Sequence, residues 1–290
     1  MNSTHTDQIL DWYAANARDL PWRAPDATPW SVLVSEIMLQ QTPVNRVLPA
    51  WSAWTARWPT PGALAAEPSG EAVRAWGRLG YPRRALRLHQ SARAIVERHG
   101  GEVPTSHGDL LALPGIGAYT AAAVASFAFG QRHAVLDTNV RRVLARLVSA
   151  QEYPPKSQTK AEVRLAESLL PLDPPTAARW GVAVMELGAL VCTARSPRCV
   201  DCPVLGACAW QKAGRPAYDG PPRKGQTYAG TDRQCRGRIL AVLRDAEGPV
   251  GKPALDVVWS DSVQRERALD GLVSDGLVDP LDDGRYALPG

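Results

Sequence analysis

Apolar residues recur at spacings of three and four along the first 220 residues, the spacing that places side chains on one face of a helix. Proline and glycine interrupt this pattern at short intervals. We therefore expect helices over 7–16, 31–42, 44–60, 63–77, 83–99, 107–113, 119–129, a segment that starts at Asp137, 159–171 and 175–191. The alternating pattern of a half-buried strand does not appear here, so the predicted fold class of this part is all-α.

The last seventy residues read differently. A stretch rich in proline and glycine over 216–230 predicts a linker. Beyond it the pattern predicts helices over 232–245, 253–259 and 263–276, followed by a hairpin over 276–288. Three helices and a small hairpin are typical of a winged helix, so we expect a small winged-helix-like α/β domain over 231–290.

The segment 31–42, SVLVSEIMLQQT, has hardly any polar face and is expected to be buried. Glu36 lies in its middle. A buried glutamate loses hydration, which favours its neutral form and raises its pKa. Such a group suits a general acid near neutral pH. The alternative is a structural glutamate paired with an arginine or a helix cap.

Residues 113–146 combine a Pro-Gly-Ile-Gly turn with two helices. Gly115 and Gly117 are expected to adopt backbone angles that a side chain would forbid. A helix that starts just after such a turn directs free N–H groups at an approaching phosphate. Asp137 follows at the head of the next helix, whose exposed side is predicted to carry Arg141, Arg142 and Arg146. The alternative is a tight turn between packed helices, with Asp137 as an ordinary N-cap.

Four of the five cysteines lie within seventeen residues, at Cys192, Cys199, Cys202 and Cys208. Their spacing, C-x6-C-x2-C-x5-C, does not suggest a disulfide framework, and four thiolates this close repel unless a metal neutralises them. A [4Fe–4S] cluster is favoured because zinc sites usually show two paired knuckles, and only Cys199 and Cys202 form one. Zinc is the alternative.

The composition and net charge narrow the classes of protein that this chain can belong to. A hydrophobic content of 45% supports a substantial core, and the ten tryptophans and frequent arginine suit a helical protein. Residues 1–220 carry a net charge of +5 and residues 221–290 a net charge of −1, which is compatible with DNA binding without requiring it. The chain shows no long uncharged apolar run and no secretory pattern at its start, so we expect a cytoplasmic protein that does not span a membrane.

Five motifs together resemble one family: SEIMLQQT, LGYPRRALRLH, LPGIGAYTAAAVASFAFG, LDTNVRRVLAR and ELGALVCTARSPRCVDCPVLGAC. In this order they are similar to the helix–hairpin–helix DNA glycosylases of the endonuclease III superfamily, and within it to the MutY-type adenine DNA glycosylases. The resemblance implies a two-lobed core over 1–215. Its six-helix lobe would span about 28–135, and its iron–sulfur cluster lobe about 1–27 with 136–215.

The resemblance also implies an activity: hydrolysis of the N-glycosidic bond of adenine mispaired with 8-oxoguanine or guanine in double-stranded DNA. Glu36 would protonate the leaving adenine. Asp137, with its pKa held low by the helix start and nearby arginines, would stabilise the oxocarbenium-like sugar. In the family Tyr119 lies near the acid and Asn139 orients the aspartate. Bifunctional relatives carry lysine where this chain has Tyr119, so we predict a monofunctional enzyme, acting as a monomer.

The base must leave the stack, and the resemblance implies that Gln41 and Tyr81 fill the gap. Gly115, Gly117 and Arg23 complete the predicted DNA contacts. Pro82 departs from the family, which usually has a second aromatic residue there. The C-terminal segment 231–290 departs further from the family, because it is too short for the Nudix-like domain of MutY-type enzymes. Its basic segment 223–244 either lies along DNA or is a solvated helix face.

Two other functions fit the same sequence. One is a sibling glycosylase that removes thymine or uracil from mismatches with guanine, and Glu36 within LQQT favours adenine over it. The other is a non-catalytic DNA-binding protein with a structural iron–sulfur cluster. The pair of Glu36 and Asp137 argues against a pure binder, since such a protein does not need an acid buried in an apolar helix.

Overall fold

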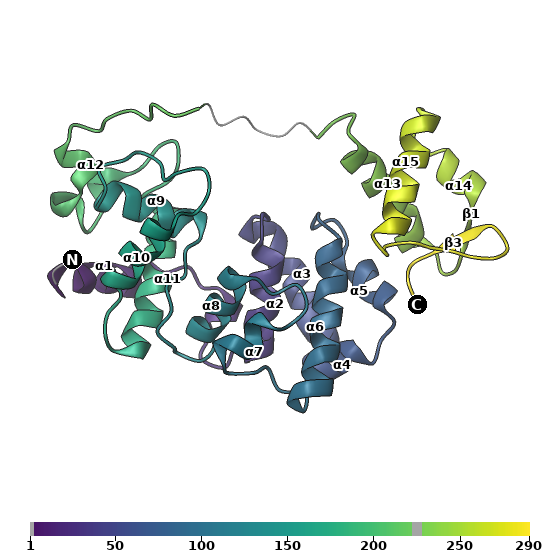
Figure 1. Ribbon diagram of the computed structural model, residues 1–290, viewed down its shortest axis with the longest axis horizontal. Helices are drawn as coiled ribbons and strands as arrows, with labels where there is room; N and C mark the ends of the chain where they lie inside the picture. Colours follow the sequence, from purple (N-terminus) through teal and green to yellow (C-terminus); the bar gives the residue numbers. More distant parts are fainter. Residues whose placement is uncertain (1–2, 222–227) are drawn as a thin grey trace. The chain divides into compact units, whose positions relative to one another are not determined.

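The computed structural model describes residues 3–221 and 228–290, and Figure 1 traces them in chain order. Their contacts group the chain into two compact units. Unit 1 comprises 1–32, 105–111 and 116–222, and unit 2 comprises 33–104, 112–115 and 223–290. The lobe boundaries expected from the sequence stay a prediction.

Helices make up the described chain before the linker. They are α1 (Ser3–Asn16), α2 (Pro29–Leu39), α3 (Val44–Arg57), α4 (Pro61–Ala65), α5 (Ser69–Trp76), α6 (Arg83–His99), α7 (His107–Leu111), α8 (Ala118–Phe127), α9 (Thr138–Leu147), α10 (Lys160–Leu169), α11 (Pro174–Leu190) and α12 (Ala209–Lys212), with 3-10 turns at Pro21–Arg23, Cys199–Asp201 and Leu205–Ala207. No strand occurs among the described residues before 222, and the all-α prediction is confirmed there.

Local chemistry sets the ends of several helices. Thr159 and Glu162 form a capping box at the start of α10, so two otherwise unpaired backbone N–H groups are satisfied. Gly100 ends α6 with a φ of 62°, a left-handed conformation that glycine adopts without steric cost. The glycine at position 100 explains why the end of the predicted helix over 83–99 agrees with the end of α6.

Two of the predicted helices differ from the structure for a reason that the local sequence explains. The helix expected over 63–77 is divided into α4 and α5, because Pro68 disfavours helical backbone in the residue before it and cannot donate a backbone hydrogen bond. The helix expected over 31–42 ends at Leu39, and Gln41 takes a left-handed φ of 55° in the turn that follows.

The core of unit 1 joins segments that lie far apart in the sequence. Ile9 of α1, Val143 of α9 and Val184 and Leu187 of α11 are buried together. The partly buried Cys192, Cys202 and Cys208 pack against the same cluster. The segment that carries the cysteines is therefore attached to the helix that Asp137 begins.

The core of unit 2 is rich in tryptophan. Trp54 packs edge-on against Trp58 and Trp76, with ring centroids 4.6 and 5.7 Å apart. All three rings are buried, as are Leu33 and Ile37 of α2. Burial of such large side chains is the main source of stability for this group of short helices.

The C-terminal module, residues 228–290, contains α13 (Asp232–Asp245), α14 (Lys252–Asp256) and α15 (Ser262–Ser274). Strands β1 (Val250–Gly251), β2 (Asp279–Pro280) and β3 (Arg285–Ala287) form an antiparallel sheet in the order β1-β3-β2. The predicted winged-helix-like arrangement of three helices and a hairpin is confirmed. The sequence pattern missed β1, which has only two residues.

None of the described helices combines the length and apolar character needed to cross a bilayer.

A buried ion pair fastens the N-terminal segment to α11. The Glu186 side chain is fully buried, and its two oxygens accept hydrogen bonds from Arg18 Nε and Nη2, both at 2.7 Å, and from Arg23 Nη2 at 3.0 Å. Burial alone would raise the pKa of Glu186, but these guanidinium groups lower it to about 2. The sequence reading did not identify Glu186.

Substituting Glu186→Gln should lower the unfolding free energy by about 2–4 kcal/mol at neutral pH, because it leaves two arginines without a buried counterion. A depressed carboxyl pKa stabilises the fold above the unfolded pKa, and this contribution disappears as the pH falls through the folded value of about 2. Denaturant unfolding from pH 7 to pH 2 measures it. The difference between variant and wild type should shrink toward acid. Glu97→Gln, which removes the partner of the exposed Arg93, is the control and should change stability little.

Candidate active site

Asp137 is the N-cap of α9, and both of its carboxylate oxygens have donors. Oδ1 accepts a hydrogen bond from the backbone N–H of Val140 at 2.6 Å. Oδ2 accepts one from the side-chain amide of Asn139 at 2.8 Å. The two hydrogen bonds fix the orientation of the carboxylate, which is what a group that stabilises a developing positive charge requires.

The electrostatic environment of Asp137 differs from the sequence expectation. Burial raises the pKa of Asp137 above its ordinary value, against the opposing effects of the hydrogen bonds from Val140 and Asn139 and of the nearby Arg142. The expected depression of the pKa was wrong because desolvation outweighs the helix start and the neighbouring cation. The ionised form of Asp137 therefore depends on the hydrogen bonds from Val140 and Asn139 and on the charge of Arg142.

The sequence suggested that the arginines of α9 lie on an exposed side of the helix, and this was wrong. Arg142 is 8% exposed and Arg146 is 1% exposed. Arg142 donates from Nη2 to Asn139 Oδ1 at 2.8 Å and from Nε to the Cys192 carbonyl at 2.8 Å. A continuous chain of hydrogen bonds thus runs from Asp137 through Asn139 and Arg142 to the backbone of Cys192.

Arg146 organises the segment that carries the cysteines. Its guanidinium binds the carbonyl oxygens of Thr193 at 2.7 Å and Ala194 at 3.0 Å, and it lies 3.4 Å from the Cys192 sulfur. Buried arginine is suited to this task because it offers five donors in a rigid plane. The sequence pattern indicated cations near Asp137 but not that their targets are carbonyl groups.

The four clustered cysteines lie close enough to influence one another. Burial, together with the nearby Cys192, Cys208 and Cys199, raises the pKa of Cys202 to about 11. Within the described part of the chain, no three metal-binding side chains converge into a formed metal centre. Four thiols are nevertheless the donor set that zinc or an iron–sulfur cluster takes, and Arg146 faces the sulfur of Cys192. Cys235 is separate and buried in the C-terminal module.

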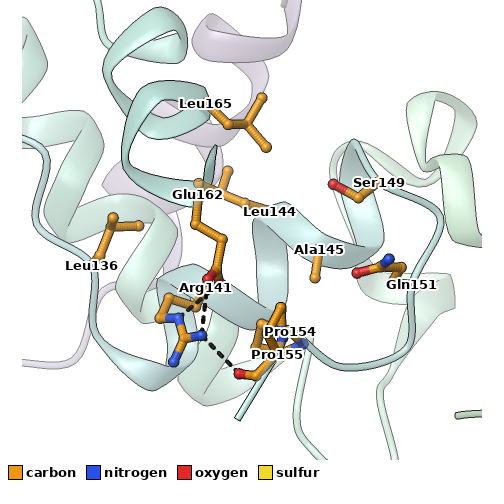
Figure 2. Close-up of a pocket in the computed structure, with 10 residues that line it drawn as sticks. All are labelled: Leu136, Arg141, Leu144, Ala145, Ser149, Gln151, Pro154, Pro155, Glu162 and Leu165. Atoms are coloured by element: carbon orange, nitrogen blue, oxygen red, sulfur yellow. Dashed lines mark hydrogen bonds and ion pairs between the residues drawn. The ribbon is translucent and has the colours of Figure 1, made fainter. Parts of the chain in front are cut away.

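A small hollow lies on another side of α9. Figure 2 shows Arg141 and Glu162 pointing toward one another beside it, with a second bond from Arg141 to the Pro155 carbonyl. Arg141 Nε lies 2.8 Å from Glu162 Oε1. This ion pair joins α9 to α10, and the hollow contains none of the residues that the sequence proposed for chemistry.

Glu36 lies in α2 and is 6% exposed, as its apolar surroundings in the sequence predicted. Its neighbours Ser35 and Ile37 are buried as well. α2 is thus a core helix of the protein with one acidic side chain.

The two residues predicted to fill the DNA stack share an uncommon backbone. Gln41 has a φ of 55° and Tyr81 a φ of 48°, both in the left-handed region that side chains disfavour. Each is exposed, Tyr81 to 44%. Strained residues of this kind persist where the surrounding structure enforces them, and they cluster at functional sites.

Arg84 is the residue that enforces both turns, and the sequence reading did not single it out beyond its place in a basic run. Its Nη1 donates to the carbonyl groups of Ile37 at 2.9 Å, Met38 at 3.0 Å and Gln40 at 2.5 Å. Its Nη2 donates to Thr42 Oγ1 at 2.9 Å and to the Gly80 carbonyl at 3.0 Å. One buried guanidinium therefore connects the turn of Gln41 to the loop of Tyr81, which is residues 77–82 between α5 and α6.

The same guanidinium lies over two aromatic rings. It is 5.5 Å from the Tyr81 ring centroid and 5.1 Å from that of Trp76. Burial lowers the pKa of Arg84 to about 10, which leaves it charged at neutral pH.

The backbone conformation of the Pro-Gly-Ile-Gly turn requires glycine at position 115 but not at position 117. Gly115 has a φ of 76°, and a Cβ there would lie 2.6 Å from Arg87 Cβ. Gly117 has an extended backbone, φ −97° and ψ 174°, so the expectation of a forbidden angle was wrong for it. Open space surrounds the Gly117 Cα, and it precedes α8 without a side-chain cap. Tyr119, in the first turn of α8, packs beside Ala122, Ala123 and Val135.

The structure thus brings together two groups of predicted residues. In unit 1, Asp137, Asn139 and the segment of Cys192 belong to one hydrogen-bonded chain. In unit 2, Gln41 and Tyr81 are linked through Arg84. Arg23 is only 17% exposed at its side chain and is held by Glu186, which does not favour the predicted DNA contact.

The chain is similar to known base excision repair proteins. HhH-GPD superfamily base excision DNA repair proteins match residues 34–168. The solved structure of a thermostable thymine-DNA glycosylase superposes with a TM-score of 0.66 at 28% identity, covering 73% of this chain and 96% of that one. Fold and motifs are therefore those of the helix–hairpin–helix class of base excision repair proteins.

Two curated relatives narrow the class. The adenine DNA glycosylases of Mycobacterium tuberculosis and Mycolicibacterium smegmatis are 54% and 55% identical to this chain over 97% and 98% of its length. The matches cover 92% and 95% of those proteins, so they include the C-terminal module. The chain belongs to the adenine DNA glycosylase family.

Substituting Asn139→Ala should move the acidic limb of the pH–rate profile to higher pH. Loss of the amide donor removes an interaction that lowers the pKa of Asp137, so the carboxylate becomes protonated at a higher pH. Single-turnover adenine release between pH 5 and 9 measures the shift. Arg141→Gln, on the same helix but directed at Glu162, is the control. An acidic limb that stays in place would show that Asn139 does not hold the carboxylate ionised.

Proposed function

We propose that this adenine DNA glycosylase removes adenine mispaired with 8-oxoguanine or guanine in double-stranded DNA by hydrolysing its N-glycosidic bond. The observation that carries the proposal is the Asp137 carboxylate, held in one orientation by Val140 and Asn139. A fixed carboxylate of this kind opposes the positive charge that develops on the sugar as the base departs.

Glu36 is proposed to supply the proton. Adenine is a poor leaving group as an anion, so its departure requires protonation by a group that is neutral at the working pH. Glu36 is 6% exposed in an apolar helix, the kind of environment in which enzymes place a carboxyl group that donates a proton. The division between a proton donor and an ionised stabiliser is the one that glycoside hydrolysis uses.

Extrusion of the base leaves a gap in the stack, which we propose that Gln41 and Tyr81 fill. Support comes from their exposed, left-handed turns and from Arg84, which holds both turns in place. The N-terminus of α8, which follows Gly115 and Gly117, is proposed to bind a DNA phosphate.

Tyr119 is proposed to limit the reaction to hydrolysis. A phenol does not form a Schiff base with the sugar, whereas the lysine of bifunctional relatives does. The product is then an abasic site in an unbroken strand. We propose that the enzyme acts as a monomer in the cytoplasm.

Cys192, Cys199, Cys202 and Cys208 are proposed to hold a [4Fe–4S] cluster. The support is the mutual proximity of their thiols and the hydrogen bonds of Arg146 to the same segment. When bound, the cluster would supply a rigid cross-link rather than hydrolytic chemistry. The segment it fixes carries Arg195 and Arg198, which are exposed and suited to the phosphate backbone.

The alternative of thymine or uracil removal keeps one support, the thymine-DNA glycosylase among the solved structures with this fold. The higher identity to adenine DNA glycosylases favours adenine. A non-catalytic DNA-binding role does not require an acidic side chain in the core of an apolar helix, where Glu36 lies.

Single-turnover release from duplexes carrying adenine opposite 8-oxoguanine, adenine opposite guanine, and thymine or uracil opposite guanine tests the proposal. Adenine should be released from the first two only. Glu36→Gln and Asp137→Asn should each slow release by about 100-fold or more while mispair binding stays similar. Arg93→Gln, which changes an exposed charge, is the control. Near-normal rates in either variant would refute the role given to that residue.

Metal analysis and visible absorption of the purified protein test the cluster. We expect about four irons per chain and the brown chromophore of an iron–sulfur protein. Cys202→Ala should abolish both, and Cys235→Ala, at the cysteine outside the set, should preserve both. Zinc at one equivalent without a chromophore would support the alternative site instead.

A further inference from the structure

Helix α5 of unit 2 is held at both of its ends by the C-terminal module. At its start, the backbone N–H of Gly70 donates to the Pro289 carbonyl at 2.6 Å. At its end, Arg74 and Val73 bind the last turn of α13. The α5 helix is also the element that leads directly into the loop of Tyr81.

The contact at the end of α5 is reciprocal. Arg74 Nη1 donates to the Ala246 carbonyl at 2.9 Å and also to the carbonyl of Arg244. In return, Arg244 Nε donates to the Val73 carbonyl at 2.9 Å. Carbonyl groups in the last turn of a helix lack partners within it and carry partial negative charge. Each helix therefore supplies the cation that satisfies the end of the other.

The contact at the start of α5 permits no side chain. A Cβ built on Gly70 would lie 2.5 Å from the Pro289 carbonyl oxygen and 2.9 Å from Leu288 Cβ. Both Gly70 and Pro289 are buried. Because one of the opposing atoms belongs to the backbone, a methyl group there must displace the end of the module.

From α5 the contacts continue into the loop of Tyr81. Trp76, the last residue of α5, donates from Nε1 to the Gly80 carbonyl at 2.9 Å. The same carbonyl accepts from Arg84, whose guanidinium lies over the Tyr81 ring. Arg83, at the start of α6, forms an ion pair with Asp275 of the module at 3.2 Å. The module therefore holds both helices that flank the loop.

The charges of the module are used within the protein. Asp232 pairs with Arg267, and Lys252 with Asp256. On α13, Arg236 pairs with Asp275, and Arg238 lies over the Trp259 ring. The idea that the basic segment 223–244 follows DNA finds no support in these partners. Arg223 and Lys224 lie outside the described residues.

We propose that the C-terminal module braces the loop of Tyr81, with Arg244 and Gly70 as positioning residues that keep the module seated on α5. The proposal rests on the proposed function only for what Tyr81 does to DNA. The brace itself is a property of the free protein.

Substituting Gly70→Ala tests the brace without removing any polar group. Alanine is the better helix former, so a loss of order must come from the displaced contact. Gly62→Ala is the matched control, since Gly62 is also the second residue of a short helix and a Cβ there meets only Thr60 Oγ1, at 3.9 Å. Hydrogen exchange of the full chain is measured over 77–82, where the amides of Gly77 and Leu79 bond to the carbonyls of Arg74 and Trp76.

Gly70→Ala should speed exchange over 77–82 and over 285–289, whereas Gly62→Ala should leave both as in the wild type. Arg244→Met should speed exchange in the same two segments. Arg244→Lys should recover the wild-type protection only in part, because lysine keeps the charge but lacks the planar fork. Faster exchange over 285–289 with unchanged exchange over 77–82 would overturn the proposal. So would unchanged exchange in both segments for both Gly70→Ala and Arg244→Met.

Adenine release gives the second measurement. Gly70→Ala should slow single-turnover release from the mispair by about three- to tenfold, the size of one lost hydrogen-bonded contact. Binding to a fully paired duplex should not change. If the wild type releases no adenine, the proposed function fails while the exchange measurement still decides the brace. If the wild type is active and Gly70→Ala matches it in rate and exchange, the brace fails alone.

Discussion

Buried arginines bound to main-chain carbonyl groups are the interaction on which this structure depends. Arg84, Arg142 and Arg146 are each at most 8% exposed, and each binds several carbonyl oxygens from segments distant in sequence. Helix ends and turns leave carbonyls without partners, and burying them unsatisfied is costly. A guanidinium offers five donors and stays charged, so a single side chain can satisfy a whole turn and fix its position.

This constraint explains how short helices support a defined site. Arg142 aligns Asn139, which in turn orients the Asp137 carboxylate. Arg84 holds two turns whose central residues, Gln41 and Tyr81, have left-handed backbones. Each strained residue costs on the order of 1–3 kcal/mol, and the hydrogen bonds of Arg84 offset that cost. Exposed side chains are thereby kept in place by a buried one.

Much of this arrangement was accessible from the sequence. Glycine, proline and capping signals located most helices, and the burial of Glu36 was predicted correctly from its apolar neighbours. The partners of the arginines could not be read this way, because carbonyl acceptors occur at every residue and leave no mark in the sequence. Arg142 and Arg146 were therefore expected to be exposed. The pKa of Asp137 was misjudged for a related reason: desolvation depends on packing by distant segments.

The most direct test of this account is the substitution Arg84→Lys, which keeps the charge and removes the fork. Lysine offers three donors from one point and cannot satisfy the turn of Gln41 and the Gly80 carbonyl together. The variant should retain the helical content of the wild type and release adenine from the mispair about tenfold or more slowly, since the two turns that fill the gap left by the base would no longer be held in place and the base would be positioned less accurately. Arg93→Lys, exposed on the same helix, should release it normally. Release by Arg84→Lys at the wild-type rate would contradict the account.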